Sequence, residues 1–382
     1  MSKIIQRKKE LRSIQGALKV FPAVAILGPR QVGKTFLARQ LKFDHYFDLE
    51  DPETFDQFRD PKFVLNDLEG LTIIDEAHRC PDLFPLLRGL LDFKAKQKYL
   101  LLGSASFEFV KITESLAGRI GYHYLDGFRL EEIGCDNWKK LWLVGGMPKA
   151  YLASNAQVSF RWIKDFITGY LVKDIRNLGL RVPAESLRRF WLMLCHYQGQ
   201  VINYSEIARA MNVSDTTCRY YLDVLKNTYM VRVLKPWHIN ISKRQVKLPK
   251  VYIRDTGVFH QLIDIHDHRK LALYPKAGFS FEGFVIEQLC TVIGKQQDEV
   301  YFWATHSGAQ LDLLWEYGGK LWGVEIKLTS SPQKTRSMHE AIRDLKLEHL
   351  WIIYPGEDVY RIDEKITVCS IKKLEAVKKY QG

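Results

Sequence analysis

The sequence lacks the features that mark metal-ribbon, disulfide-rich and membrane proteins. Its six cysteines form no C-x-x-C pair, so neither a zinc ribbon nor a disulfide framework is expected. No run approaches the roughly 18 apolar residues that a membrane-spanning helix needs, and residues 1–10 lack the apolar core of a signal peptide. We therefore predict buried thiols and a cytoplasmic protein without membrane contact.

Internal repeats and low-complexity linkers are missing as well, so the domain boundaries are soft. The chain has 382 residues, of which 46% are hydrophobic and 26% charged, which is typical of a globular protein of two or three domains. The formal net charge of +12 favours a polyanionic partner. Nucleic acid is the usual partner of this kind, and an acidic membrane surface is the other.

Apolar, strand-like runs alternate with amphipathic segments in the first part of the chain. Such alternation is typical of an α/β domain. The strand-like runs lie at residues 23–27, 71–75 and 99–103, and a helical segment lies at 36–41.

The pattern changes twice further along. From about residue 160 to 229, apolar residues recur three and four positions apart, which indicates a helical region. After about residue 278 the order is helix, three short strands, helix and strand, as in an α+β domain. These strands are predicted at 300–303, 311–315, 321–327 and 350–354, with the second helix at 334–345. We therefore predict three domains, at residues 1–155, 156–256 and 257–382.

Residues 28–35 predict a phosphate-binding loop. Their sequence, GPRQVGKT, matches G-x-x-x-x-G-K-[ST] and stands between an apolar strand and a helix. Glycines let backbone N–H groups approach phosphate oxygens, while Lys34 reaches the β and γ phosphates and Thr35 ligates Mg²⁺. The residues expected to bind ATP are Gly28, Pro29, Arg30, Gln31, Val32, Gly33, Lys34, Thr35 and Phe36.

A second nucleotide motif is predicted at residues 71–76, LTIIDE. Asp75 is expected to bind the nucleotide's Mg²⁺, and Glu76 to orient or deprotonate the attacking water. An apolar strand ending in two acids is commonplace on its own. Its place 40 residues after the phosphate-binding loop favours the functional interpretation.

Several stretches together resemble one family of prokaryotic AAA+ ATPases. In its members an N-terminal ATPase module is joined to a C-terminal domain of unknown function. The matching stretches, in chain order, are GPRQVGKT, YFDLEDP, IIDEAHRCPDLFPLLRGL, LLLGSAS, ESLAGRI, GGMP, YLVKDI and KRQVKLPKVYIRDTGV.

This resemblance implies roles for two further residues of the ATPase module. Ser104, at the tip of the strand in LLLGSAS, would sense the γ phosphate, or it is a serine in a strand-end turn. Arg119 in ESLAGRI would act as an arginine finger on a neighbouring chain, or it forms a surface salt bridge. A finger that acts in trans requires a homo-oligomer.

The middle region carries a helix-turn-helix signal with a basic segment after it. Asn203 and Ser214 are expected to begin two short helices, and the strand-like runs that follow predict a winged helix. Between residues 224 and 254 there is no Asp or Glu, which favours contact with a nucleic-acid backbone over a solvated basic face or a protein-docking module, and DNA is the nucleic acid that we expect. Within this segment Lys243 and Arg244 have a further alternative, facing a neighbouring ATPase module. The expected nucleic-acid contacts are Lys226, Arg232, Lys243, Arg244, Lys247 and Lys250.

Two carboxylates and a lysine are predicted to converge in the last domain. Asp312 lies on one strand, and Glu325 and Lys327 lie two residues apart on the next, so they share a face. With the surrounding elements this spacing resembles the PD-(D/E)XK nuclease fold, in which such groups hold Mg²⁺ or Mn²⁺ for phosphodiester cleavage. Glu282 on the preceding helix is expected to complete the metal site. The alternative is an inherited fold in which these residues form a buried ion-pair network.

The sequence thus predicts an ATP-hydrolysing AAA+ protein that binds nucleic acid and cleaves it with a metal-dependent C-terminal domain. Two alternatives stay open. One is a nucleotide-switched binding protein that cuts nothing, and the other is a DNA motor or loader resembling branch-migration ATPases.

Overall fold

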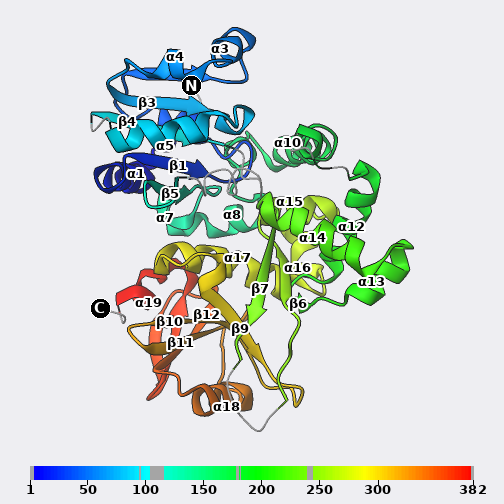
Figure 1. Cartoon of the computed structure of the whole chain (residues 1–382). Coiled ribbons are helices and arrows are strands. Elements are labelled where there is room, and N and C mark those ends of the chain that lie inside the picture. Colours follow the sequence, from blue (N-terminus) through cyan, green and yellow to red (C-terminus); the bar gives the residue numbers. More distant parts are fainter. Residues whose placement is uncertain are drawn as a thin grey trace. The chain divides into compact units, whose positions relative to one another are not determined.

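The computed structural model describes residues 4–93, 96–103, 116–177, 180, 182–238 and 244–379. The chain divides into two compact units (Figure 1). The first comprises Met1–Gly127 with Asn227–Tyr229, and the second comprises Phe128–Lys226 with Met230–Gly382.

The first unit is built on a five-stranded parallel sheet in the order β2-β3-β4-β1-β5. All five residues of β1 are buried, as expected for a parallel sheet covered on both faces. The strands are β1 (Ala23–Leu27), β2 (His45–Asp48), β3 (Gly70–Asp75), β4 (Gln97–Leu102) and β5 (Ile120–Tyr124). The helices include α1 (Lys8–Val20), α2 (Lys34–Ala38), α3 (Pro52–Gln57), α4 (Pro61–Leu65) and α5 (Leu83–Phe93).

Alternation along β1 directs its side chains to opposite faces of this sheet. Ala23, Ala25 and Leu27 belong to one hydrophobic cluster with Phe84 and Leu87 of α5. Helix α1 contacts β1 and β5. The carboxyl ends of β1 and β3 lie at one edge of the sheet, with β4 between the two strands, and this edge positions the predicted nucleotide residues.

The second unit begins with helices and continues into a large sheet. Its helices before the sheet are α7 (Leu130–Ile133), α8 (Trp138–Val144), α9 (Pro148–Tyr151), α10 (Ala156–Gly169), α11 (Ile175–Asn177), α12 (Ala184–His196), α13 (Tyr204–Met211) and α14 (Asp215–Asn227). Its later helices are α15 (Thr256–Leu262), α16 (His268–Leu273), α17 (Ala277–Ile293), α18 (Arg336–Leu345) and α19 (Glu375–Lys379). Among the described residues of both units, no helix combines the length and apolarity needed to cross a bilayer.

Nine strands of this unit form one sheet in the order β13-β14-β12-β11-β10-β9-β7-β8-β6. Pairing of β7 with β9, at Lys235 and Tyr301, joins the strands of the middle region to those of the C-terminal region. The predicted boundary between residues 256 and 257 therefore does not interrupt the sheet. The strands are β6 (Gln200–Val201), β7 (Val231–Pro236), β8 (Lys250–Ile253), β9 (Val300–Ala304), β10 (Gln310–Tyr317), β11 (Lys320–Ile326), β12 (His349–Tyr354), β13 (Val359–Asp363) and β14 (Ile366–Ser370).

Two helices of the middle region begin where the sequence predicts. The side chain of Asn203 accepts a hydrogen bond from the backbone N–H of Glu206 at the start of α13. The Ser214 hydroxyl accepts one from the N–H of Thr217 at the start of α14. Each cap satisfies a backbone donor that has no partner within its helix.

Helix α17 is buried on nearly every side, including its polar residues Glu282, Glu287 and Gln288. A helix that is apolar all round belongs in a core, so buried acids on it need cationic or hydrogen-bonding partners. Those partners come from β7, β8 and the segment after Phe128. All six cysteines are free and five are buried, which confirms the predicted thiols.

Candidate nucleotide-binding site and C-terminal acid cluster

The loop between β1 and α2 has the backbone of a phosphate-binding loop. Gly28, Gln31 and Gly33 have positive φ angles of 154°, 63° and 92°. A Cβ on Gly28 would lie 2.0 Å from the carbonyl oxygen of Leu125, so only glycine fits there. Helix α2 starts at Lys34, which points the N–H groups of its first turn toward the loop.

Lys34 turns back into this loop and is buried, with a relative exposure of 7%. Its ammonium donates hydrogen bonds to the carbonyl oxygens of Gly28 and Pro29, at 3.0 and 2.9 Å. The dipoles of these two carbonyl groups hold the buried ammonium of Lys34 at the loop. From this position the ammonium can contact a ligand that the loop binds.

Thr35 and Asp75 meet where α2 begins and β3 ends. The Thr35 hydroxyl donates to Oδ2 of Asp75 at 2.6 Å, and the phenol of Tyr46 on β2 donates to the same oxygen at 3.0 Å. Burial raises the pKa of Asp75 despite these bonds. Burial and then the charge of Asp75 raise the pKa of Tyr46 to about 12. The hydroxyl and carboxylate are hard oxygen donors of the kind that Mg²⁺ prefers, so this pair fits a nucleotide-bound Mg²⁺.

Glu76 has a left-handed backbone conformation with φ at 50°. Its Oε2 lies 3.2 Å from Nδ1 of His78, and both side chains are largely buried. Burial acts to raise the pKa of Glu76, but the close contact with His78 and the charges of Lys34, His78 and Arg30 lower it below the ordinary value. Glu76 therefore stays ionised beside the loop.

Arg30, Phe36 and Ser104 are further predicted residues of this module. Arg30 lies 3.7 Å from Glu50, and Phe36 is half exposed on α2. Strand β4 ends at Leu102 between β1 and β3, but Ser104 lies outside the described residues. Its role stays a prediction.

Arg119 lies at the opposite edge of the sheet from the phosphate-binding loop. Its carbonyl accepts a hydrogen bond from the N–H of Ala23, at the start of β1, and five strand residues span about 16 Å. Its guanidinium forms a two-bond ion pair with Asp92, at 2.5 and 2.9 Å. This ion pair is the salt bridge that the sequence left as an alternative. The distance across the sheet excludes contact between Arg119 and phosphates bound to its own chain.

The predicted basic surface of the middle region is smaller than the sequence suggests. Arg232 is 2% exposed and Lys250 is 4% exposed, and each is paired with a glutamate of α17. Neither reaches a nucleic acid, so their prediction as phosphate contacts is corrected. Arg244 and Lys247 are exposed and Lys226 is half buried, while Lys243 lies outside the described residues.

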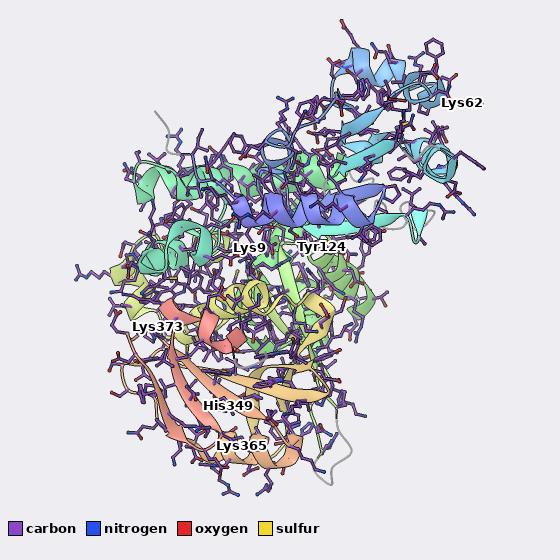
Figure 2. The ribbon with its side chains drawn as sticks, turned by 90° about the vertical axis from the view of Figure 1, so that its left-hand side faces the viewer. Lys9, Lys62, Tyr124, His349, Lys365 and Lys373 are labelled. Atoms are coloured by element: carbon purple, nitrogen blue, oxygen red, sulfur yellow. The ribbon has the colours of Figure 1, made fainter. Side chains whose placement is uncertain are left out.

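Positive charge is also spread over both units. Figure 2 labels four lysines outside the basic segment of the sequence, and each has an exposed side chain. Lys9 and Lys62 belong to the first unit, and Lys365 and Lys373 to the second. The net charge of the protein therefore does not identify residues 224–254 as its single candidate surface for binding a polyanion.

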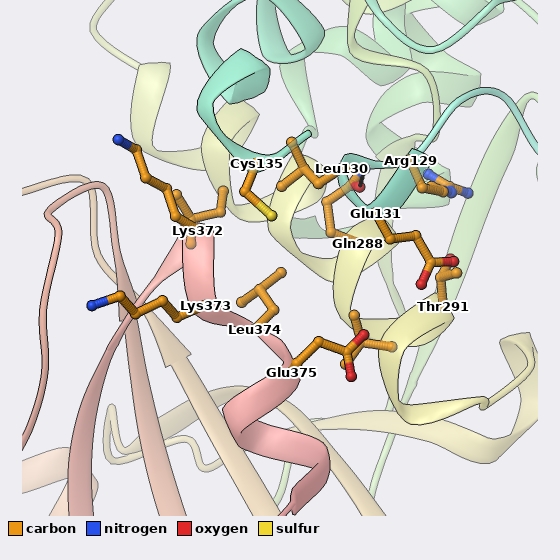
Figure 3. Close-up of a pocket in the computed structure, with 12 residues that line it drawn as sticks. Arg129, Leu130, Glu131, Cys135, Gln288, Thr291, Lys372, Lys373, Leu374 and Glu375 are labelled. Carbon is orange, nitrogen blue, oxygen red and sulfur yellow. Dashed lines mark hydrogen bonds between the residues drawn. The ribbon is translucent and has the colours of Figure 1, made fainter. Parts of the chain in front are cut away.

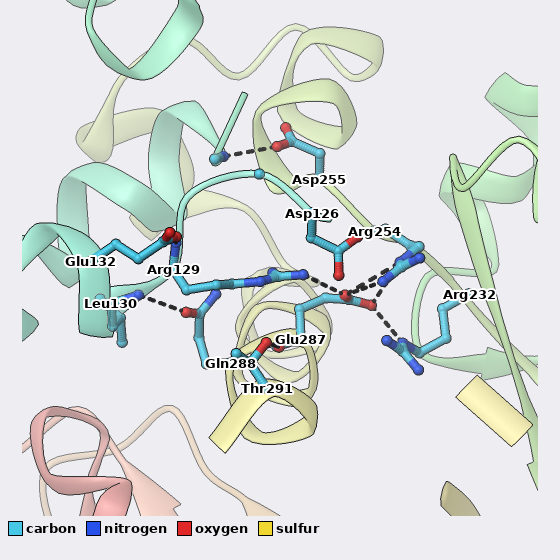
Figure 4. Close-up of polar contacts among 12 residues, drawn as sticks. Asp126, Arg129, Leu130, Glu132, Arg232, Arg254, Asp255, Glu287, Gln288 and Thr291 are labelled. Atoms are coloured by element: carbon cyan, nitrogen blue, oxygen red, sulfur yellow. Dashed lines mark hydrogen bonds and ion pairs between the residues drawn. The ribbon is translucent and has the colours of Figure 1, made fainter. Parts of the chain in front are cut away.

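Glu287 is surrounded by three arginines from separate segments (Figure 4). Its carboxylate lies 3.2 Å from Arg129, 2.5 Å from Arg232 and 3.0 Å from Arg254. Burial acts to raise the pKa of Glu287, but Arg232, Arg254 and Arg129 lower it well below its ordinary range. The network fixes the segment after Phe128, β7 and the end of β8 to one point on α17.

The predicted C-terminal carboxylates do converge, but lysines stand among them. Asp312 and Glu325 lie on the paired strands β10 and β11, and both are buried. Lys327 lies 2.7 Å from Oε1 of Glu325. Lys250 reaches in from β8, with its ammonium 3.2 Å from Glu282 and 3.6 Å from Asp312.

The remaining oxygens of this acid cluster are mostly hydrogen-bonded. Tyr252 donates to Oε1 of Glu282 at 2.5 Å, and the N–H of Ile326 donates to Oδ2 of Asp312 at 2.9 Å. Burial and then the charge of Asp312 raise the pKa of Glu282 to about 7 and that of Glu325 to about 8. Each carboxylate thus has a cation, a proton or a donor beside it.

This donor set does not fit the predicted second metal ion. In the described part of the chain, no group of three or more His, Cys, Asp or Glu side chains is arranged to hold a metal. The reason is physical, because Lys250 already supplies positive charge between two of the three expected ligands. The prediction of Glu282, Asp312 and Glu325 as ligands of Mg²⁺ or Mn²⁺ therefore finds no support in this geometry. The ion-pair network, which the sequence left as an alternative, describes the cluster.

The second unit also has a pocket of about 80 Å³ between α17 and the C-terminal segment (Figure 3). Leu130, Cys135, Gln288 and Leu374 are among its lining residues. Its volume is well below the roughly 300 Å³ of a typical small-molecule site, so we assign no ligand to it.

Sequence reasoning missed several residues that organise these sites. Tyr46 carries no motif of its own, although it lies in the stretch YFDLEDP. Tyr252 and Lys250 stand two apart on β8, so alternation places them on one face, but nothing in the sequence identifies their partners on α17.

Comparison with known proteins divides the chain into three matched regions. Residues 20–134 match the model of the AAA domain. Residues 135–269 match the domain of unknown function DUF8612, and residues 277–374 match the domain of unknown function DUF4143. The first region contains the geometry described above, so the chain contains an AAA-type P-loop ATPase module.

Two mycobacterial proteins match almost the whole chain. They are the uncharacterized proteins Rv2008c of Mycobacterium tuberculosis and Mb2031c of Mycobacterium bovis. Each is 42% identical over 368 residues, which cover 95% of this chain and 83% of the relative. The chain belongs to the family of these two proteins. Among solved structures, the Walker-type ATPase PABY2304 of Pyrococcus abyssi is similar to 68% of this chain and 96% of its own, with 16% identity and a TM-score of 0.49.

Proposed function

We propose that this protein binds and hydrolyses ATP with Mg²⁺ at the edge of the first unit's sheet. The observation that carries the proposal is the contact of the Thr35 hydroxyl with Asp75 at 2.6 Å, beside the loop that holds Lys34. These groups come from two motifs 40 residues apart in the sequence. Their meeting at the end of parallel strands provides positive charge, oxygen ligands and a neighbouring carboxylate in one place.

Each residue has a defined task in this proposal. The N–H groups of the loop and the Lys34 ammonium bind the β and γ phosphates, with Lys34 exchanging its two carbonyl partners for phosphate oxygens. Thr35 and Asp75 would hold Mg²⁺, which when bound neutralises charge on these phosphates. Glu76 orients the attacking water and accepts its proton, once its side chain turns from His78 toward the γ phosphate.

Steady-state ATP hydrolysis and nucleotide binding test this proposal directly. Glu76→Gln should lower kcat by about 100-fold or more while ATP still binds, because it removes the base and keeps the shape. Lys34→Ala should weaken ATP binding itself. Lys42→Ala, at an exposed lysine nearby, is the matched control and should behave as wild type. Unchanged turnover in Glu76→Gln would contradict the assignment.

A second candidate function, nucleic-acid binding by the middle region, is supported by the order of its elements. Helices α13 and α14 are followed by the paired strands β7 and β8, as in a winged helix. Exposed Arg219 on α14 and exposed Arg244 and Lys247 before β8 are available to phosphates, most simply those of DNA.

Salt dependence separates this function from a docking role. Replacing Arg244 and Lys247 together by alanine should weaken DNA binding and reduce the slope of log K against log salt by about 2. The double variant Lys42→Ala with Lys62→Ala removes equal charge from the first unit and should leave the slope unchanged. Equal slopes in all three proteins would exclude these two residues as phosphate contacts.

Cleavage of nucleic acid is not part of the proposal. Asp312, Glu325 and Lys327 do converge, which supports descent from a nuclease-like arrangement. The ammonium of Lys250 nevertheless holds two of the carboxylates that a metal would need. We therefore expect single-stranded, duplex and branched DNA to stay intact with ATP and Mg²⁺ or Mn²⁺. Cutting that is lost in Lys327→Ala would restore the nuclease prediction.

A further inference from the structure

Lys250 is enclosed in a site that is built for a cation. Its ammonium lies 3.2 Å from Oε1 of Glu282 and 3.6 Å from Oδ1 of Asp312. The ring centroid of Phe302 lies 5.6 Å away, which places an aromatic ring within cation–π range. Carboxylates on two elements and an aromatic ring on a third thus surround one positive charge.

The backbone holds Lys250 in this position. Lys250 pairs with Leu234 of β7 on one side and with Val201 of β6 on the other. These strand pairs fix the backbone of Lys250. Its contacts with Glu282 and Asp312 hold the ammonium within the cluster.

A divalent cation would compete with this ammonium for the same oxygens. Mg²⁺ and Mn²⁺ bind carboxylate oxygens at close range, and the oxygens that face the interior of the cluster already face Lys250 or Lys327. Oε2 of Glu325 is buried and has no hydrogen-bond partner among the described residues. The ammonium groups of Lys250 and Lys327 beside these carboxylates repel a dication that approaches the same oxygens.

We propose that the acid cluster of the second unit is a cation site whose resident cation is the Lys250 ammonium, which replaces a divalent metal. The middle region thereby supplies the charge that a nuclease-like arrangement of acids would take from solution. Removing the ammonium while keeping the aliphatic stem opens a divalent-cation site made by Glu282, Asp312 and Glu325. This inference does not depend on ATP hydrolysis.

Mn²⁺ binding to the full-length protein, measured by electron paramagnetic resonance without nucleotide, tests this inference. All proteins carry Asp75→Asn, which removes the carboxylate that is proposed to bind Mg²⁺ at the nucleotide site. Addition of Lys250→Met should create one Mn²⁺ site per chain, at least 10-fold tighter than any site in the parent. Further addition of Glu325→Gln should abolish it. Lys247→Met, an exposed lysine three residues earlier, is the matched control and should gain no site.

The outcomes separate the two descriptions of the cluster. Stoichiometric Mn²⁺ binding by the parent that disappears in Asp312→Asn would overturn the inference, because a metal would then bind despite Lys250. A folded Lys250→Met protein that gains no site would also overturn it. Circular dichroism and thermal melting show whether each variant folds, and Lys250→Gln replaces Lys250→Met if the methionine variant does not fold. If neither variant folds, Mn²⁺ binding to the parent protein tests the inference. A parent that has no Mn²⁺ site sensitive to Asp312→Asn supports the Lys250 ammonium as the resident cation.

Discussion

Tyr46 donates a hydrogen bond to the carboxylate of Asp75, which is proposed to hold Mg²⁺. Its phenol donates to the same Asp75 oxygen as Thr35 does, so it fixes that oxygen in place. Tyr46→Phe should lower kcat for ATP hydrolysis by roughly 3- to 10-fold and raise the Mg²⁺ concentration that gives half-maximal rate, because loss of a supporting hydrogen bond loosens the ligand. Titration of the rate with Mg²⁺ measures both effects.

A control variant distinguishes positioning from general damage. Tyr317→Phe removes a phenol from an exposed site in the second unit and should leave the rate unchanged. If Tyr46→Phe lowers the rate without changing its Mg²⁺ dependence, Tyr46 does not act through Asp75.

Glu325 should make the second unit less stable as pH rises. Burial and the charge of Asp312 raise its pKa from 4.5 to about 8. Between these values the folded state binds more protons than the unfolded state, so the free energy of unfolding falls with pH, by at most about 1.4 kcal/mol per unit for one proton. Glu325→Gln cannot ionise and should show a shallower decline between about pH 5 and pH 8 in urea unfolding.

The matched control for this titration is Glu316→Gln, at an exposed acid on the neighbouring strand β10. It should keep the wild-type dependence on pH. Identical slopes for Glu325→Gln and wild type would mean that Glu325 is already ionised in the folded protein near neutral pH.

Buried charge is the feature that sequence reasoning could not locate. Arg232 and Lys250 stand in a stretch without acids, which suggests an exposed basic surface. Their partners Glu287 and Glu282 lie on α17, 55 and 32 residues later, and pairing at that distance leaves no local pattern. The phosphate-binding loop was predictable because a loop, a strand end and a helix start lie within a few residues.

At the scale of elements, α13 depends on its first-turn cap. Asn203→Ala removes the acceptor for the N–H of Glu206 and should lower the free energy of unfolding of the second unit by about 1 kcal/mol. Denaturant unfolding followed by circular dichroism measures this. Thr216→Ala, at an exposed position on α14, should cost less than about 0.5 kcal/mol. Equal costs for both variants would show that the cap contributes no more than an ordinary surface residue.

Elements with a strong local signal were predictable, and short or unmarked ones were not. The strands β1, β3 and β4 and the helix α18 are confirmed close to their predicted bounds. The partly exposed β13 and the buried β14 were missed, as were β2 and β5 of the first sheet. β13 and β14 are stabilised by pairing within the sheet rather than by an apolar alternation of their own.

At the scale of the whole molecule, the hypothesis that Arg119 is an arginine finger predicts cooperation between chains. Arg119 cannot reach the nucleotide of its own chain, so under this hypothesis it acts on a neighbour. Arg119→Ala and Lys34→Ala should each be nearly inactive, and an equal mixture should recover on the order of a quarter of wild-type turnover, because intact fingers then meet intact loops. Turnover assays of the mixture measure this.

The ion pair of Arg119 with Asp92 supplies the control for this experiment. Asp92→Asn weakens the salt bridge but keeps the finger, so it should retain most of the activity. If Arg119→Ala turns over ATP like wild type at every protein concentration, the arginine serves only the salt bridge.

The pairing of β7 with β9 limits how this protein can be dissected by expression. A gene cut between codons 256 and 257 would yield two fragments, each with a freshly exposed strand edge where Lys235 and Tyr301 now pair. Such edges recruit other chains, so the separate pieces would tend to aggregate. The middle and C-terminal regions are therefore expected to fold and to be produced as one block.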